Sequence, residues 1–352
     1  MFAARLSSVK RNRRPTLEDV AEVAGVSRAL VSLALNDSPR VAAASKMLIL
    51  EAAASLDYRP NLAARNLASH RTGTIGVMLN DLHNPYYVDV FDGVSAAATE
   101  TERSLLLTTG RNQMAGEREA IASMLAHRVD GIVLVGPMIP TSEISRLAES
   151  VPVVLVGRTV RDVHVDCVAN HEAEGAAIAV GHLVALGHRR IAHIDGGSGA
   201  GASARRTGFE RAVKALGIDS DCEVIPGDYT EAAGTSAAKR ILKRKIRPTA
   251  LFCANDLVAI GSMDTFAAAD VRTPEDISVI GYDNSMLARL SRISLTSIDQ
   301  STQLLGRVAL DLLNQRLDIQ ASASADSVGK SQRIELVTPT LITRRTTSSP
   351  AS

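Results

Sequence analysis

From Thr74 onward the chain alternates short apolar runs with longer segments of helical periodicity, and this alternation constrains the fold more than any other sequence feature. The predicted strands are 74–80, 104–109, 130–136, 151–157, 190–195, 249–254 and 277–282. The predicted helices lie near 85–101, 115–128, 142–149, 171–186, 204–216, 231–245 and 256–269. Strands that are apolar throughout and connected by helices form parallel sheets buried on both faces. The sequence therefore predicts an α/β fold with two doubly wound parallel sheets rather than one large sheet.

The last part of the chain supplies the elements that a body of two lobes needs for its final crossovers. A predicted helix at about 301–316 is followed by a Ser/Ala-rich loop from Ala321 to Ser331 and a short strand near 334–342. The expected lobes are about 73–170 with 300–330, and about 171–299 with 331–345, followed by a tail at 346–352. Ligands of open parallel sheets bind at the carboxyl ends of the strands, so we expect a binding cleft between the lobes.

The beginning of the chain has the pattern of a small all-α head. Thr16-Leu17-Glu18-Asp19 fits a capping box at the start of a helix, which Gly25-Val26 ends. Ser27 can cap a second short helix, 28–35. Two short helices joined by a turn that contains Gly predict a helix-turn-helix, whose core a third helix at about 43–56 completes.

The charge distribution separates this head from the body. The whole chain carries a formal net charge of +1. Residues 1–70, however, contain ten Lys and Arg against six Asp and Glu, so the head is basic and the remainder slightly acidic. A basic head on an acidic body indicates a nucleic-acid partner. We expect residues 1–15 to form a basic arm and residues 16–60 the helix-turn-helix domain.

Composition excludes several other classes of protein. No run approaches the roughly 18 apolar residues that a membrane span needs. The three cysteines, Cys167, Cys222 and Cys253, are too few and wrongly spaced for a disulfide framework or a zinc site. We therefore expect a cytoplasmic protein without a membrane partner, a metal or a cofactor.

Several stretches, taken in order, resemble the lactose/galactose-repressor family of bacterial transcription regulators. In the head they are TLEDVAEVAGVSRALVSLALN (16–36) and YRPNLAARNL (58–67). In the body they are TGTIGVMLNDLHNPYY, RVDGIVLVG, HLVALGHRRIAHI, RPTALFCANDLVAIG, TPEDISVIGYDN and SLTSIDQ. The resemblance extends from about residue 16 to 345, and the number and order of its motifs make it specific.

The resemblance implies an architecture and a function. Its head is a DNA reader, residues 61–72 are a hinge helix and linker, and residues 73–345 resemble a periplasmic sugar-binding protein that also dimerises. Such a protein is no enzyme but a repressor that binds a near-palindromic operator as a homodimer or a higher oligomer. A small effector, expected to be a sugar, binds between the two lobes and changes how the heads contact the operator.

The second helix of the motif contains the candidate base-reading residues. Its core face is expected to consist of Val31, Ala34 and Leu35, which leaves Arg28, Ala29, Ser32 and Leu33 facing outward. Leu33 stands where the family often has a polar residue, so packing within the head is an alternative for it. Ala42 lacks the side-chain oxygen that usually caps the third helix. The expected DNA contacts are Thr16, Ser27, Arg28, Ala29, Ser32, Leu33, Asn61 and Leu67, the last as a wedge in the minor groove that the resemblance implies.

The candidate effector residues follow predicted strands or begin the helices after them. They are Tyr86, Tyr87, Arg158, Arg205, Tyr229, Asn255, Asp283 and Gln300. Aromatic faces combined with a few fixed donors and acceptors suit a sugar or a similar polar ring. His171 stands about where an Asp is common in the family, which leaves the contact at that position open.

Two alternatives belong to other classes of protein. Gly197-Ser198-Gly199-Ala200-Gly201-Ala202 fits the dinucleotide fingerprint G-x-G-x-x-G/A, as in an NAD-dependent dehydrogenase. The preceding strand is the fifth in the series, however, whereas the fingerprint normally opens its domain. An exported solute-binding protein would share the body but would have no use for residues 1–70. A gel shift with the DNA that flanks the gene distinguishes these classes, because only a regulator gives a specific band.

Overall fold

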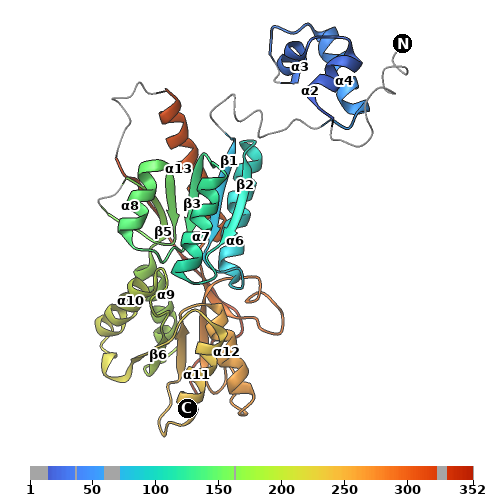
Figure 1. The fold of residues 1–352 in the computed structure, drawn as a ribbon. Coiled ribbons are helices and arrows are strands. Elements are labelled where there is room, and N and C mark those ends of the chain that lie inside the picture. The colour runs from blue at the N-terminus through green and yellow to red at the C-terminus, as the bar shows by residue number, and fades with distance from the viewer. Residues whose placement is uncertain (1–14, 36–37, 59–71, 162–163, 323–330, 352) are drawn as a thin grey trace. The chain divides into compact units, whose positions relative to one another are not determined.

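The computed structural model of the chain describes residues 15–35, 38–58, 72–161, 164–322 and 331–351. The chain divides into two compact units, Met1–Thr72 and Gly73–Ser352, and Figure 1 shows the helices and strands of both. Among the described residues, no helix combines the length and the apolar character that crossing a membrane requires.

The first unit is a helix-turn-helix followed by a third helix. It contains α2 (Leu17–Ala24), α3 (Arg28–Leu35) and α4 (Ala43–Ser55), and Val20, Val31 and Ile49 are at the centre of its core. The predicted capping box is present, with the Asp19 carboxylate accepting from the Thr16 backbone N–H at 2.7 Å. Ala42 gives α4 no side-chain cap, as expected. The predicted helix at 62–68, with Asn61 and Leu67, falls outside the described residues.

The second unit contains two six-stranded sheets, and the first of them is entirely parallel. Its order is β11-β5-β4-β3-β1-β2. The strands are β1 (Thr74–Leu79), β2 (Ser104–Thr109), β3 (Gly131–Val135), β4 (Val153–Val156), β5 (Asp166–Asn170) and β11 (Ile334–Val337). The sheet and its helices are called the first lobe below.

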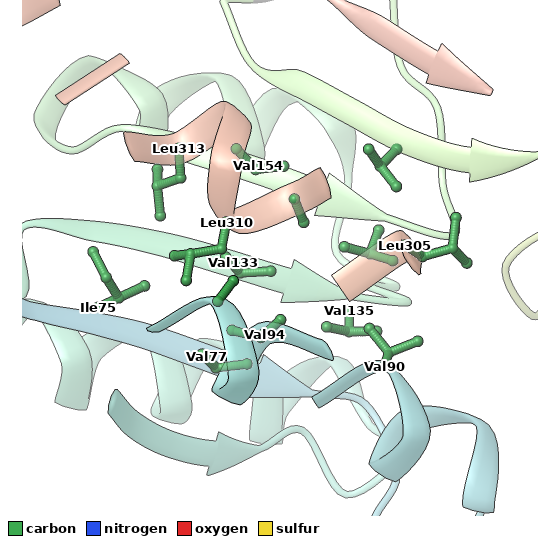
Figure 2. Close-up of a cluster of buried hydrophobic side chains, with 14 of the residues drawn as sticks. Ile75, Val77, Val90, Val94, Val133, Val135, Val154, Leu305, Leu310 and Leu313 are labelled. Atoms are coloured by element: carbon green, nitrogen blue, oxygen red, sulfur yellow. The ribbon is translucent and has the colours of Figure 1, made fainter. Parts of the chain in front are cut away.

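Helices cover both faces of this first sheet. They are α6 (Pro85–Glu100), α7 (Met114–Ala126), α8 (Thr141–Ser150) and α13 (Thr302–Ser322). On one face, Val90 and Val94 of α6 and Leu310 of α13 pack against strand residues such as Val77 and Val133 (Figure 2). The other face buries apolar side chains of α7 and α8. Burial on both faces explains why these strands are apolar throughout.

The second sheet has the order β12-β10-β9-β8-β6-β7, and β12 pairs antiparallel with β10. Its strands are β6 (Ile191–Ile194), β7 (Glu223–Ile225), β8 (Ala250–Cys253), β9 (Ser278–Asp283), β10 (Thr296–Asp299) and β12 (Thr340–Ile342). Its helices are α9 (Glu172–Ala185), α10 (Ala202–Ala215), α11 (Glu231–Leu242) and α12 (Asp256–Ala267). Together they form the second lobe, so the predicted two-sheet α/β architecture is confirmed.

The structure differs from the sequence predictions at the end of the chain. The single strand predicted near 334–342 is two strands, and its first part, β11, pairs with β5 in the first lobe rather than joining the second. The predicted tail also packs on the second lobe, where the Thr346 hydroxyl donates to the Val279 carbonyl at 2.7 Å. These segments are held by hydrogen bonds to side chains and to strands distant in sequence. The hydropathy pattern of the chain cannot predict such hydrogen bonds.

Three crossovers connect the lobes, after β5, β10 and β11. Asn170, the last residue of β5, lies where the three segments meet. Its side-chain amide donates to the backbone carbonyl of Gln300 at 2.8 Å and also reaches that of Val337 at 3.4 Å. A single buried side chain therefore joins all three connections between the lobes.

Candidate ligand cavity and DNA-reading helix

A small cavity lies at the carboxyl ends of strands from both sheets and is lined by side chains that follow those strands. The first lobe contributes Asn84, Tyr86, Tyr87, Gly136 and Gly157, and the remaining lining residues are Glu172, Ala200, Arg205, Tyr229, Asn255, Asp283 and Gln300. Seven of the eight candidate effector residues therefore come together here, all except Arg158. The lining combines three tyrosine rings with charged and amide groups.

Arg205, in the first turn of α10, is the cation of this cavity and is only 3% exposed. Its Nη2 and Nε lie 2.7 and 3.1 Å from one carboxylate oxygen of Glu172, and its Nη1 donates to the Ala254 carbonyl. The guanidinium carbon also lies 3.4 Å from the centroid of the Tyr282 ring. Burial opposes the charge and is the largest single effect, but Glu172, Tyr229, Tyr282 and Asp283 together outweigh it, so the pKa of Arg205 is raised. The guanidinium is consequently a fixed, permanently charged donor.

Asp283 ends β9 in a backbone conformation that few L-residues adopt, with φ 115°. The side-chain amide of Gln300 donates to its Oδ1 at 2.5 Å. Burial, and after it the neighbouring Asp256, raises the pKa of Asp283 well above the usual range of a carboxyl group. A hydroxyl or amine donor brought into the cavity would supply the partner that this carboxylate needs to be charged.

The aromatic residues are held by the helix starts next to them. Asn84 caps α6 by accepting from the Tyr86 N–H at 3.0 Å, and the rings of Tyr86 and Tyr87 meet edge to face at 5.3 Å between centroids. The Tyr229 hydroxyl donates to the Ala200 carbonyl at 2.7 Å. Asn255 caps α12 and donates to the Tyr229 carbonyl at 3.0 Å. The rings are therefore placed before any ligand arrives.

The glycine-rich segment after β6 has a packing role in this cavity. A β-carbon on Gly199 would lie 2.3 Å from the Tyr229 ring, and one on Gly201 would lie 2.6 Å from the Glu172 carboxylate. The strand before this segment, β6, is the first strand of the second sheet along the chain, so its late position in the whole chain does not exclude the fingerprint. The glycines make room for the Tyr229 ring and the Glu172 carboxylate, so close packing inside the cavity accounts for them without a dinucleotide.

Arg158 lies outside the cavity, in a groove beside it. Its Nη1 donates to the backbone carbonyls of Pro137 and Ile139, the latter at 2.6 Å, and its Nη2 donates to the Thr141 hydroxyl. Arg158 therefore holds the loop after β3. The sequence prediction placed Arg158 with the ligand because Arg158 follows a strand. Its guanidinium is instead hydrogen-bonded to this loop.

Glu172 is the main cavity residue that the sequence prediction missed. It lies at the start of α9, after β5, and its carboxylate is buried against Arg205. The adjacent His171, which the resemblance placed in doubt, is exposed. The available signal was the strand before it, but β5 was not predicted. Among the described residues, no group of three or more His, Cys, Asp or Glu side chains could hold a metal ion.

In the head, the outward face of α3 consists of the expected residues. Arg28 and Ala29 are exposed, and Leu33 is 40% exposed, so Leu33 is not a packing residue of the head. Ser32 is half-buried, whereas Val31 and Ala34 are buried in the core. The candidates Thr16 and Ser27 use their hydroxyls as helix caps, Thr16 in the capping box of α2 and Ser27 by accepting from the Leu30 N–H at 3.2 Å.

Both units of the chain match known protein families. Residues 16–61 match the family described as bacterial regulatory proteins, lacI family, and residues 72–338 match periplasmic binding proteins and the sugar binding domain of the LacI family. The HTH-type transcriptional repressor PurR of Photobacterium profundum is 32% identical over 306 residues, which are 86% of this chain and 92% of that protein.

Solved structures are similar over nearly the whole chain. The Lac repressor dimer bound to operator and the anti-inducer ONPF has a TM-score of 0.84 and 29% identity, covering 96% of this chain and 100% of that chain. The complex of the transcriptional regulator CelR with cellobiose has a TM-score of 0.68 and 29% identity, covering 95% and 100%. With a helix-turn-helix head and a body of two lobes built on mostly parallel sheets, the chain belongs to the LacI family of DNA-binding transcriptional regulators.

Proposed function

We propose that the protein is a cytoplasmic repressor without enzymatic activity, whose operator affinity is set by a sugar bound in the cavity between the lobes. The observation that carries this proposal is the convergence of Tyr86, Tyr87, Arg205, Asp283 and Gln300 on one cavity. Flat aromatic faces and a few fixed polar groups are the usual means of holding a polar ring.

The charges in the cavity favour an uncharged ligand with hydroxyl groups. Glu172 already engages two nitrogens of Arg205, and the third binds a backbone carbonyl. The charge of Arg205 is therefore already paired by Glu172, although two of its five N–H groups can still donate, so the cavity holds no unpaired cation to attract an anionic ligand. Hydroxyl groups can donate to Asp283 and accept from the Gln300 amide. Cellobiose, a neutral sugar, is the ligand of the similar CelR structure.

The proposed DNA complex has two heads on a near-palindromic operator. One small head contacts too few base pairs for operator-level specificity, and two-fold symmetry in the protein is mirrored in the half-sites. The Lac repressor, which is similar over 96% of this chain, is a dimer in its complex with operator. We propose that the outward residues of α3 contact bases, that Thr16, Ser27 and Asn61 contact the backbone, and that Leu67 is the minor-groove wedge.

A thermal-shift screen of sugars, polyols and nucleobases tests the ligand. A ligand at about 100 times its dissociation constant adds roughly 2.7 kcal/mol to the free energy of unfolding. We expect a neutral sugar or polyol to raise the melting temperature, and the same compound to change a gel shift with the DNA flanking the gene. A nucleobase that stabilises the protein, with no sugar doing so, would contradict the sugar assignment. Absence of any specific band would contradict the regulatory function itself.

A further inference from the structure

The outward face of α3 has a simple composition. Ala29 and Leu33 carry no hydrogen-bonding side-chain group, and their apolar surfaces suit thymine methyl groups. Arg28, the first residue of α3, carries the planar fork of donors that matches O6 and N7 of guanine. Ser32 is half-buried and carries only one hydroxyl, so the hydrogen-bonded part of base recognition on this face depends mainly on how the Arg28 guanidinium is oriented.

A residue of the neighbouring helix holds that guanidinium. Glu18 is the second residue of α2, and its Oε1 lies 3.1 Å from Nε of Arg28. Both helix starts are fixed, α2 by the capping box of Thr16 and Asp19 and α3 by the Ser27 hydroxyl. The side chains of Glu18 and Arg28 therefore extend from two fixed backbone positions. Both side chains are exposed, at 60% for Glu18 and 67% for Arg28, and so remain accessible to DNA.

We propose that Glu18 is a positioning residue that orients Arg28 to read one guanine in each half-site. A carboxylate on Nε occupies the side of the guanidinium and leaves the two terminal nitrogens pointing away from it, where they can donate to O6 and N7 together. Glu18 acts through Arg28 and does not itself contact a DNA base.

Preorganisation explains why such a pair contributes to specificity although an exposed ion pair contributes little to stability. A long Arg side chain without a partner samples many rotamers and can bind a phosphate as readily as a base. Holding Nε in advance lowers the entropy lost on binding the base. It also disfavours the competing phosphate contacts, which carry no sequence information.

Another role for Glu18 is direct contact with cytosine, whose N4 amino group can donate to a carboxylate. The two roles differ in which variant changes which base preference. If Glu18 positions Arg28, its replacement matters only while Arg28 is present. If Glu18 reads cytosine, its effect persists when Arg28 is removed.

The experiment uses the full chain and a pool of random-sequence duplexes. The parent protein selects its site from the pool, and single-base substitutions of that site are then titrated with Glu18→Gln, Arg28→Ala and the double variant. Glu51→Gln is the matched control, because it removes one negative charge from an exposed position on α4 of the same head. Binding to a scrambled duplex is measured in parallel.

We expect the parent to select a guanine in each half-site and Arg28→Ala to abolish that preference. Glu18→Gln should weaken the preference for guanine over the other bases by at least about fivefold, the lower end for a bidentate contact. It should also bind the scrambled duplex at least as tightly as Glu51→Gln does, since both lose a negative charge. In the Arg28→Ala background, Glu18→Gln should have no further effect on base preference.

Three results would overturn the proposal. One is a guanine preference of Glu18→Gln equal to that of Glu51→Gln. Another is a parent site without a guanine that depends on Arg28, and the third is a cytosine preference that Glu18→Gln loses even in the Arg28→Ala background. Misfolding does not imitate the expected result, because an unfolded head would lose affinity for the selected and the scrambled duplex together.

Discussion

Asp256 is a buried carboxyl group next to Asp283 of the cavity, and its oxygens accept hydrogen bonds from other parts of the second lobe. Asp256 accepts from the Ser297 hydroxyl at 2.6 Å and from the Ser285 N–H at 2.7 Å. Burial nevertheless raises the pKa of Asp256 to about 6, because these hydrogen bonds compensate only part of the cost of removing a charge from water. Its native form therefore retains a proton at a pH where an exposed Asp has lost it.

This raised pKa predicts how stability depends on pH. Between about pH 4 and pH 6 the native protein binds more protons at Asp256 than the unfolded chain does, so its contribution to the free energy of unfolding falls as pH rises through this window. Asp256→Asn cannot titrate and should make stability less dependent on pH there. Chemical denaturation at pH 4, 5, 6 and 7 measures the effect, with Asp311→Asn, at an exposed position of α13, as the control. Equal pH dependence in the two variants would contradict the prediction.

At this scale the sequence predicted the residues that follow recognisable strands. Arg205 and Asp283 come after apolar runs and were placed in the cavity correctly. Glu172 was missed because the strand before it, β5, begins with Asp166 and ends with Asn170. Asp166 is buried inside the first lobe because Arg316 and Arg333 both pair with it. Only the folded chain brings those arginines to a residue more than a hundred positions away.

The packing of helices depends on glycines that let two backbones touch. In α13, a β-carbon on Gly306 would lie 2.0 Å from the Val90 carbonyl oxygen of α6. In α6, one on Gly93 would lie equally close to the Gln303 carbonyl oxygen of α13. No Cβ fits at such distances unless the helices separate. Gln300, a residue of the cavity, lies just before the start of α13. The packing of α13 on α6 therefore also helps to position Gln300.

Gly306→Ala should therefore destabilise the first lobe, by about 1–3 kcal/mol as for other overpacked cores. Gly181→Ala is the matched control, because a β-carbon at this position in α9 would meet nothing within 4 Å. That variant should be neutral or stabilised by up to about 1 kcal/mol, the difference in helix propensity between Gly and Ala. Thermal and chemical denaturation of both variants provides the measurement. A loss of stability at Gly181 equal to that at Gly306 would show that the helix contact is not the cause.

The elements that the sequence missed share a physical cause. β10 contains the buried polar residues Thr296 and Ser297, whose hydroxyls bond to distant groups, such as the Asp256 carboxylate. The continuous apolar runs that identify central strands cannot reveal such a strand. β11 pairs with β5 across more than 160 residues, so its lobe is determined by that long-range pairing and not by its neighbours in sequence. Periodicity predicted the apolar strands and most helices, whereas β10 and β11 needed the tertiary structure.

At the scale of the whole molecule, the cavity and the connections between the lobes share a residue. The Gln300 side chain donates to Asp283 in the cavity, and its backbone carbonyl accepts from Asn170, which also bonds to the third crossover. A ligand that engages Asp283 therefore acts directly on the segments that connect the lobes. A ligand shifts a conformational equilibrium only by its different affinities for the two states, and this arrangement provides contacts that can differ.

Asp283→Ala separates effector binding from operator binding. Removing a partner from a buried polar site costs roughly 1–3 kcal/mol, so the sugar found in the screen should bind at least about fivefold more weakly. Operator affinity without effector should stay unchanged, because the head is a separate unit of the chain.

Calorimetry with the sugar and an operator titration test both halves of this prediction. Asp264→Ala, the same substitution on the exposed face of α12, is the control and should bind sugar and operator as the parent does. Normal sugar binding by Asp283→Ala would remove Asp283 from the ligand site. Loss of operator binding without effector would instead make Asp283 a structural residue, because a side chain needed only for the ligand cannot change the affinity of the empty protein for DNA.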